Sequence, residues 1–376
     1  MTRKSPIRKP AVDGGAFTSA FNFVPARLTL AREAQGWTMR ELATRINTTS
    51  SAISQFENGK TRPSGDALRR LSFAFGIAPG FFAVEGPPRI DPARCHFRHR
   101  RTVTQMQRRV VLARGEMRLD VAAYLAQHVN FPVGKLLEMI PTSKRWDTTA
   151  EGIERLAEMV RDAWGLGSGP ISNAVRLLEE HGVLPVEVPG HTERLDAFST
   201  WVDSWPIIFI ATEKQSASRR RFDVIHELGH LLLHPTAAPG DPRLEREADS
   251  FASAFLMPRH PFALESPKRL IWPHLLELKL RWKVSLAALV RRAYDLRIFS
   301  EATYRRAFVQ LSKRGWRRVE PDEPELEHPT LLKEALTLLI GSGFSPAQLA
   351  ADLGRNPVEL EQLVSSSRPG ELSLFG

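Results

Sequence analysis

The feature that most constrains the fold of this chain is residues 221–235, which contain an H-E-x-x-H motif made by His226, Glu227 and His230. The apolar residues around the motif favour a helix, and Pro235 marks its expected end. Because the two histidines are four positions apart, a helix places both imidazoles on one face, about one turn apart. That geometry suits two nitrogen ligands of Zn2+, with Glu227 close enough to act as general base on a metal-bound water.

A motif this short does not establish a metal site. By residue frequency alone it occurs in roughly one or two chains of this length per hundred. The alternative is therefore a helix that carries two histidines by chance. A zinc site needs a third ligand, and we expect that ligand to come from a separate element pointing at the same place.

The residues from Glu245 onwards are the expected source of the third ligand, because they form an amphipathic pattern that ends at Pro258. Glu245 and Asp249 share a helix face, so Glu245 can bind the metal while Asp249 accepts a hydrogen bond from the far nitrogen of a ligating histidine. Glu247 points elsewhere by helical spacing and is the weaker candidate. The alternative for Glu245 is a solvated acidic first turn, where the helix dipole favours carboxylates.

His234 lies four positions beyond His230 and shares its helix face. Two roles are open for it. It could reach the site and stabilise an oxyanion, or it could cap the C-terminal end of the helix, where the dipole favours a histidine.

The H-E-x-x-H motif with the 245–249 segment and residues 251–258 resembles the ImmA/IrrE family of metallopeptidase-like proteins. Residues 195–199 and 214–219 are also similar to that family, and the resemblance covers roughly residues 150–260. It implies a thermolysin-like zincin, an α+β domain with a small sheet. It also implies one Zn2+ per chain, bound by His226, His230 and Glu245, with Glu227 catalytic. The residues expected to support the ligands are Asp249, from its helical spacing, and His234 if it reaches the site.

Three short apolar runs ahead of the motif predict the strands of that sheet, at residues 183–188, 197–202 and 207–211. In thermolysin-like folds an edge strand of the sheet pairs with an extended peptide substrate.

A second pattern covers residues 24–83, where turn and capping signals separate helical runs. The expected helices form a bundle of five, over residues 26–35, 38–46, 50–58, 66–75 and 80–83. Thr38 and Glu41 have the spacing of a capping box. The run resembles the Cro/repressor-type (XRE) helix-turn-helix, in which the second helix of the motif enters the major groove of double-stranded DNA.

Position matching to that family assigns the DNA contacts. The implied base readers are Ser50, Ser51, Ser54 and Gln55, and the implied phosphate contacts are Arg40, Thr49, Asn58 and Lys60. Gln55 is the one good bidentate reader among them and suits adenine. Residues 1–85 carry twelve Lys and Arg against six Asp and Glu, which favours a polyanionic partner. The alternative is a dimerisation or protein-binding module without DNA contact.

Composition and breaks in the pattern divide the mainly helical chain into seven segments. These are a disordered basic arm (1–20), the helix-turn-helix domain (21–85), a linker with a basic run (86–104), the metallopeptidase domain (105–265), a helical extension (266–316), an acidic linker (317–329) and a C-terminal helical unit (330–376). The last is spaced like a second helix-turn-helix, although a plain packing role is the preferred interpretation.

The formal net charge of +10 favours nucleic acid as a partner, and the single cysteine, Cys95, fits a reducing cytoplasm. No run approaches the ~20 apolar residues that would span a membrane. We therefore expect a cytoplasmic DNA-binding regulator, either monomeric or a homodimer, fused to a zinc peptidase. The resemblance implies that it cleaves a repressor or other regulatory protein in stress response or mobile-element control. The alternatives are a transcription factor whose zinc domain senses a ligand or is structural, and an antitoxin-like partner-binding protein.

Overall fold

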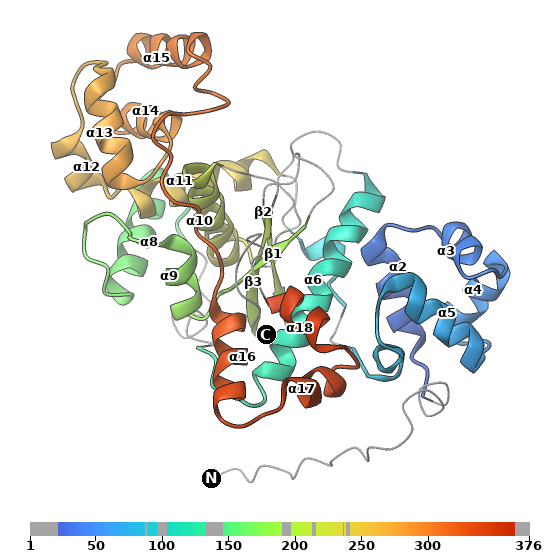
Figure 1. Ribbon diagram of the computed structural model, residues 1–376. Coiled ribbons are helices and arrows are strands. Elements are labelled where there is room, and N and C mark those ends of the chain that lie inside the picture. The colour runs from blue at the N-terminus through green and yellow to red at the C-terminus, as the bar shows by residue number, and fades with distance from the viewer. Residues whose placement is uncertain are drawn as a thin grey trace. The chain divides into compact units, whose positions relative to one another are not determined.

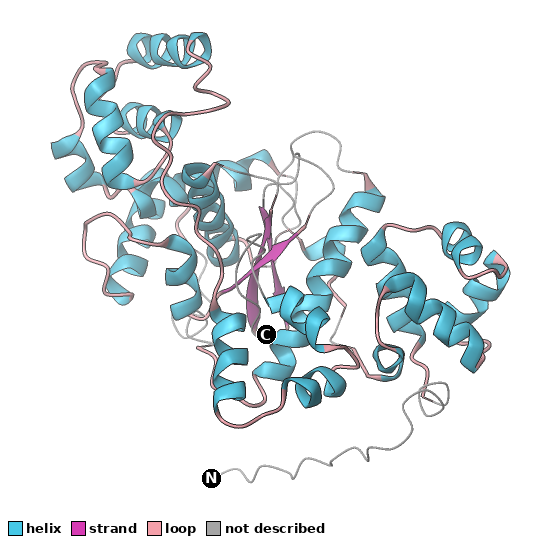
Figure 2. Ribbon diagram, in the orientation of Figure 1, coloured by secondary structure: helices cyan, strands magenta, loops and turns pink. Residues whose placement is uncertain are grey.

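The computed structural model describes residues 22–86, 89–95, 104–132, 146–189, 197–212, 216–235, 237 and 241–364. It divides into two compact units. Unit 1 consists of residues 1–87, 116–128 and 335–376, and unit 2 consists of residues 88–115 and 129–334. Helices predominate in both, as expected, and the strands belong to unit 2 (Figure 2). The expected basic arm and the basic run at 96–101 lie outside the described residues.

Unit 1 contains the helix-turn-helix pattern. Its elements are α2 (Pro25–Gln35), α3 (Met39–Arg45), α4 (Ser50–Glu57), α5 (Gly65–Phe75) and the 3-10 helix η1 (Pro79–Ala83). Thr38, Thr49 and Ser64 each accept a hydrogen bond from a first-turn amide, which begins α3, α4 and α5 where the sequence predicts. The fifth member of the bundle is a 3-10 helix, because five residues starting at a proline can close few α-helical hydrogen bonds.

The rest of unit 1 comes from later parts of the chain: the second half of α6 (Gln105–Leu125), the end of α16 (Leu331–Gly341), α17 (Pro346–Asp352) and α18 (Pro357–Val364). Arg27 of α2 donates hydrogen bonds of 2.5 and 3.1 Å to Asp120 of α6. The Cζ atoms of Arg27 and Arg355 lie 4.7 and 4.8 Å from the ring centroid of Phe81 in η1. The C-terminal helices therefore pack on the helix-turn-helix bundle.

Unit 2 is built on a three-stranded sheet of β1 (Leu184–Val188), β2 (Ala197–Val202) and β3 (Trp205–Ala211). The central strand β3 pairs in parallel with β1 and antiparallel with β2. These strands coincide closely with the three predicted runs. Phe198 and Phe209 are register partners across β2 and β3, and their rings stack with centroids 4.7 Å apart.

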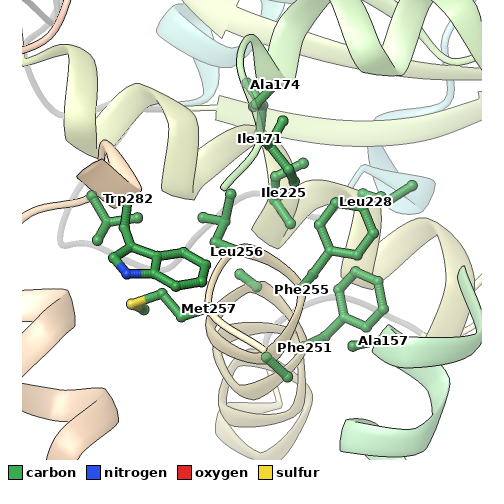
Figure 3. Packing of buried hydrophobic residues seen from close by; sticks show 14 of the residues in the cluster. Ala157, Ile171, Ala174, Ile225, Leu228, Phe251, Phe255, Leu256, Met257 and Trp282 are labelled. Atoms are coloured by element: carbon green, nitrogen blue, oxygen red, sulfur yellow. The ribbon is translucent and has the colours of Figure 1, made fainter. Parts of the chain in front are cut away.

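Unit 2 includes the first half of α6 and the start of α16. Its other helices are η2 (Pro92–Arg94), α8 (Ala150–Ala163), α9 (Ala174–Glu180), α10 (Ala217–Leu233), α11 (Pro242–Leu256), α12 (Arg259–Glu265), α13 (Trp272–Trp282), α14 (Leu286–Asp295) and α15 (Glu301–Lys313). Helix α10 packs beside β2, β3 and α11, and α11 also packs against α8 (Figure 1). Figure 3 shows the rings of Phe251 and Phe255 near Leu228 and Ala157. This apolar core holds α10 and α11 side by side.

Residues 320–330, called the strap from here on, contain most of the expected acidic linker (317–329). The strap is not helical, and three of its glutamates bind other parts of unit 2. Glu320 accepts hydrogen bonds of 2.8 Å from the Nζ of Lys279, a fully buried lysine, and from the first backbone amide of α14, at Leu286.

The next strap glutamates bind two other helices. Glu323 accepts hydrogen bonds from the backbone amide and hydroxyl of Ser218, at the start of α10. Glu327 accepts a 2.8 Å hydrogen bond from Ala174, the first residue of α9, and pairs with buried Arg221 of α10. One short segment thus caps the N-terminal ends of α14, α10 and α9, where unpaired amides and the helix dipole favour carboxylates.

Candidate functional site

Two helices position the candidate metal ligands. His226 and His230 are buried on α10, whose last helical residue, Leu233, lies two positions before the expected Pro235. Between them, Gly229 faces α11, and a Cβ added there would lie 3.2 Å from the Cα of Ala248. A larger residue would therefore force the two helices apart.

The structure brings together the ligand set expected from the sequence. The Nε2 atoms of His226 and His230 lie 3.1 Å apart, and the Glu245 carboxylate oxygens lie 3.5 and 3.4 Å from them. All three candidate ligand atoms lie within 4.8 Å of one another. The Glu245 side chain is 23% exposed, whereas both imidazoles are buried, so the cluster is open to solvent on its carboxylate side.

These distances fit a zinc ion. Tetrahedral ligands about 2.0–2.1 Å from Zn2+ are separated from one another by about 3.3 Å, close to the three separations within the cluster. Two imidazole nitrogens and one carboxylate oxygen are also a donor set of catalytic zinc sites, in which the fourth position is left for water or substrate.

The charges around the cluster favour the same arrangement. Burial by itself raises the pKa of Glu245, but hydrogen bonds and charge attraction from His226 and His230 outweigh it and lower that pKa below its usual value. Burial lowers the pKa of His230. A neutral imidazole beside an ionised carboxylate is what metal ligation requires.

Asp249 lies where helical spacing predicts, one turn after Glu245. Its Oδ1 is 2.8 Å from the Nδ1 of His226. Because a carboxylate accepts and cannot donate, the proton of neutral His226 resides on Nδ1, which leaves the Nε2 lone pair directed at the cluster.

Glu227 is buried next to His226, and its Oε2 accepts a 2.6 Å hydrogen bond from the hydroxyl of Ser199 in β2. Ser199 is fully buried and was not among the expected site residues. A hydroxyl in a strand of otherwise mostly apolar residues was the signal that could have revealed it. The side chain links the sheet to the carboxylate beside the candidate metal ligands.

His234 is the C-terminal cap residue of α10, and its ring points toward the cluster. Its Nδ1 lies 3.1 Å from the Nδ1 of His230, and its Nε2 lies 2.8 Å from Oε2 of Glu247. Helical spacing makes Glu247 a poor metal ligand, and the structure places this residue instead behind the cluster as the partner of His234.

The DNA-reading residues expected in unit 1 lie on or next to α4, with Arg40 on α3. Gln55, Lys60 and Arg40 are exposed. The Asn58 amide, expected at a phosphate, donates to the backbone oxygen of Ser54 at 2.8 Å and lies 3.3 Å from the Ser54 hydroxyl. The Thr49 hydroxyl oxygen caps α4, while Ser50 and Ser51 are exposed in its first turn.

Models of two known protein families match this chain, one within each unit. Residues 28–82 match the family model described as helix-turn-helix, and residues 178–294 match the peptidase-family model described as IrrE N-terminal-like domain. The chain joins an XRE-type helix-turn-helix domain to an ImmA/IrrE-like domain. No curated protein matches the chain.

The IrrE-like match agrees with the domain family expected from the sequence. It runs from α9 to α14, so it includes the sheet, α10 and α11, and it enters the predicted helical extension (266–316). It ends before the strap. Among the described residues, no helix is both long and apolar enough to cross a membrane.

Proposed function

We propose that this protein is a cytoplasmic DNA-binding regulator whose IrrE-like domain is a zinc-dependent peptidase that cleaves a repressor or other regulatory protein. The observation that carries the proposal is the convergence of His226, His230 and Glu245 beside Glu227. A structural zinc site normally has four protein ligands. Three ligands with an adjacent carboxylate are the arrangement of a hydrolytic site.

Each residue of the site has a distinct task in this proposal. His226, His230 and Glu245 bind the ion, which, when bound, polarises the scissile carbonyl and lowers the pKa of water. Glu227 accepts the proton of the attacking water and later passes it to the leaving amine. The Ser199 hydroxyl holds the Glu227 carboxylate in one position, so that this carboxylate does not need to reorganise during proton transfer.

DNA recognition is proposed for α4 of unit 1. Gln55 is the residue best suited to read a base, and the exposed cations Arg40 and Lys60 suit phosphate contacts. Combining DNA binding with proteolysis in one chain lets cleavage of a regulator be coupled to control of the bound gene, in stress response or mobile-element control.

The first test is metal content, measured by inductively coupled plasma mass spectrometry on the full-length protein. We expect about one zinc per chain, as the ligand set requires, and loss of that zinc in the Glu245→Gln variant. Glu265→Gln is the matched control, because the Glu265 side chain is similarly exposed, at 28%, and pairs with Arg281 away from the cluster. Full zinc content in Glu245→Gln would contradict the ligand assignment.

The second test separates proteolysis from ligand sensing. Glu227→Gln keeps the side-chain shape and removes the general base, so zinc content and DNA binding should stay at the wild-type level. Derepression of the target genes should be lost, because the repressor is no longer cleaved. If Glu227→Gln regulates normally while His226→Ala does not, the site is a sensor that binds metal without hydrolysis.

A further inference from the structure

The two candidate histidine ligands are supported by different partners from the same helix. Asp249 of α11 contacts the Nδ1 of His226 directly. Behind His230, the Nδ1 atom faces another imidazole, that of His234, and the far nitrogen of His234 faces Glu247, also on α11. His230 is therefore backed by two residues in series, His234 and Glu247, whereas His226 is backed by Asp249 alone.

This series lies inside the protein. The side chains of His234 and Glu247 are 3% and 9% exposed. The second carboxylate oxygen of Glu247 faces Arg243, with 3.7 Å between Oε1 and the guanidinium Nε. Arg243 is therefore a charge contact of Glu247 at a distance longer than a hydrogen bond, whereas the Nε2 of His234 lies within hydrogen-bonding distance of the carboxylate.

The positions of the protons follow from what a carboxylate can do. Glu247 accepts and cannot donate, so the Nε2 of His234 carries a proton. In a neutral ring the Nδ1 of His234 is then an acceptor, and it can accept only if the Nδ1 of His230 donates. That leaves the Nε2 lone pair of His230 facing the Nε2 of His226 and the carboxylate of Glu245.

We propose that Glu247 and His234 form a relay that sets the tautomer and orientation of His230 for metal binding. Asp249 performs the same task for His226 in one step. The relay depends on the metal-binding role proposed above for His230, and it makes Glu247 and His234 positioning residues that do not touch the ion.

Helix geometry explains why the second support needs two residues. Glu245 and Asp249 are one turn apart on α11 and face the cluster, whereas Glu247 lies between them on another side of the helix. His234, one turn beyond His230 on α10, covers the remaining distance. Capping does not account for the imidazole, because the cap uses the backbone amide of His234, which any residue except proline supplies.

The test uses the full-length protein with Glu247→Gln, a substitution of the same shape. A glutamine side chain can donate as well as accept, so it no longer dictates which nitrogen of His234 is protonated. We expect zinc affinity, measured by competition with a chromophoric chelator, to fall about 10- to 100-fold. The urea unfolding midpoint of the metal-free protein should stay close to that of wild type.

Nitrogen NMR of histidine-labelled, metal-free protein gives a readout that a purely structural role would not change. In wild type we expect the Nδ1–H tautomer at His230, and in Glu247→Gln a mixture of tautomers. His328→Ala is the control for His234→Ala, because His328 also pairs with a buried carboxylate, that of Glu187, and is outside the cluster. His328→Ala should retain wild-type zinc affinity, while His234→Ala weakens it.

Two results would overturn the relay: an Nε2–H tautomer at His230 in wild type, or wild-type zinc affinity in Glu247→Gln. Failure of the underlying metal proposal looks different, since wild type itself would then bind no zinc. In that case the tautomer measurement still tests whether Glu247 and His234 set the tautomer of His230, because it uses protein without metal.

Discussion

Replacing Glu327 with glutamine should destabilise unit 2 strongly, although the residue lies in a segment without helix or strand. Glu327 is buried, pairs with the buried guanidinium of Arg221 and accepts hydrogen bonds from the backbone amides of Ala174 and Val175. Glutamine has nearly the same shape, and its carbonyl oxygen can still accept from α9. The substitution therefore removes mainly the negative charge opposite Arg221.

The expected cost follows from the burial of the partner. Arg221 is 1% exposed, and its remaining hydrogen bonds, such as that to the carbonyl of Ile171, bring no opposite charge. Breaking a buried ion pair from one side costs about 3–5 kcal/mol. Because the amide contacts of Glu327 are retained, we expect the lower value, about 3 kcal/mol. With a urea m-value of about 3 kcal/mol per molar, the unfolding midpoint should fall by about 1 M.

Tryptophan fluorescence during urea titration is a suitable assay, because seven of the eight tryptophans belong to unit 2. Glu325→Gln is the matched control: it makes the same charge change in the strap at an exposed side chain, so its midpoint should shift by less than about 0.2 M. Equal midpoints for the two variants would refute the view that a buried carboxylate holds this segment in place.

Further predictions concern pH and DNA. Burial raises the pKa of Glu179 from 4.5 to about 7, so the ionised side chain destabilises the folded state. This destabilisation is absent below pH 4.5, grows between pH 4.5 and pH 7, and is complete above pH 7. Urea titrations at pH 5 and 8 should therefore show that the free energy of unfolding of Glu179→Gln, relative to that of wild type, increases with pH by on the order of 3 kcal/mol. The same difference at both pH values would contradict this. Gln55→Ala should weaken binding to a selected DNA site by about 1–3 kcal/mol and relax preference at one base pair, whereas the exposed α2 control Gln35→Ala should bind normally in the same fluorescence anisotropy titration.

Local signals predicted much of the fold. The first turns of α3 and α4 begin at hydroxyl caps, and the strands around Phe209 follow from continuous apolar runs. The cluster of His226, His230 and Glu245 was predictable for the same reason, since each ligand lies in a helix with a clear period and the family resemblance paired the two helices.

Contacts between residues distant in the sequence were not predictable in this way. Nothing local in an acidic, proline-containing segment indicates that Glu320, Glu323 and Glu327 cap three helices, because their partners are 34 to 153 positions away. Glu247 was set aside because helical spacing excludes it as a metal ligand. Its link to the site passes through a second residue, which spacing on a single helix cannot reveal.

The contact between η1 and the C-terminal helices also determines when the DNA-binding unit can be completed during synthesis. Gly354 has φ +64, and a Cβ there would lie 2.3 Å from the carbonyl carbon of Gly80, so the two backbones meet directly. The helix-turn-helix bundle leaves the ribosome early, but its partner at Gly354 is made roughly 270 residues later, a delay of roughly 15 to 55 s at ordinary translation rates. The bundle consequently acquires its last neighbours only after the whole IrrE-like domain has been translated, and a chain interrupted within that domain carries a DNA-binding unit that lacks them.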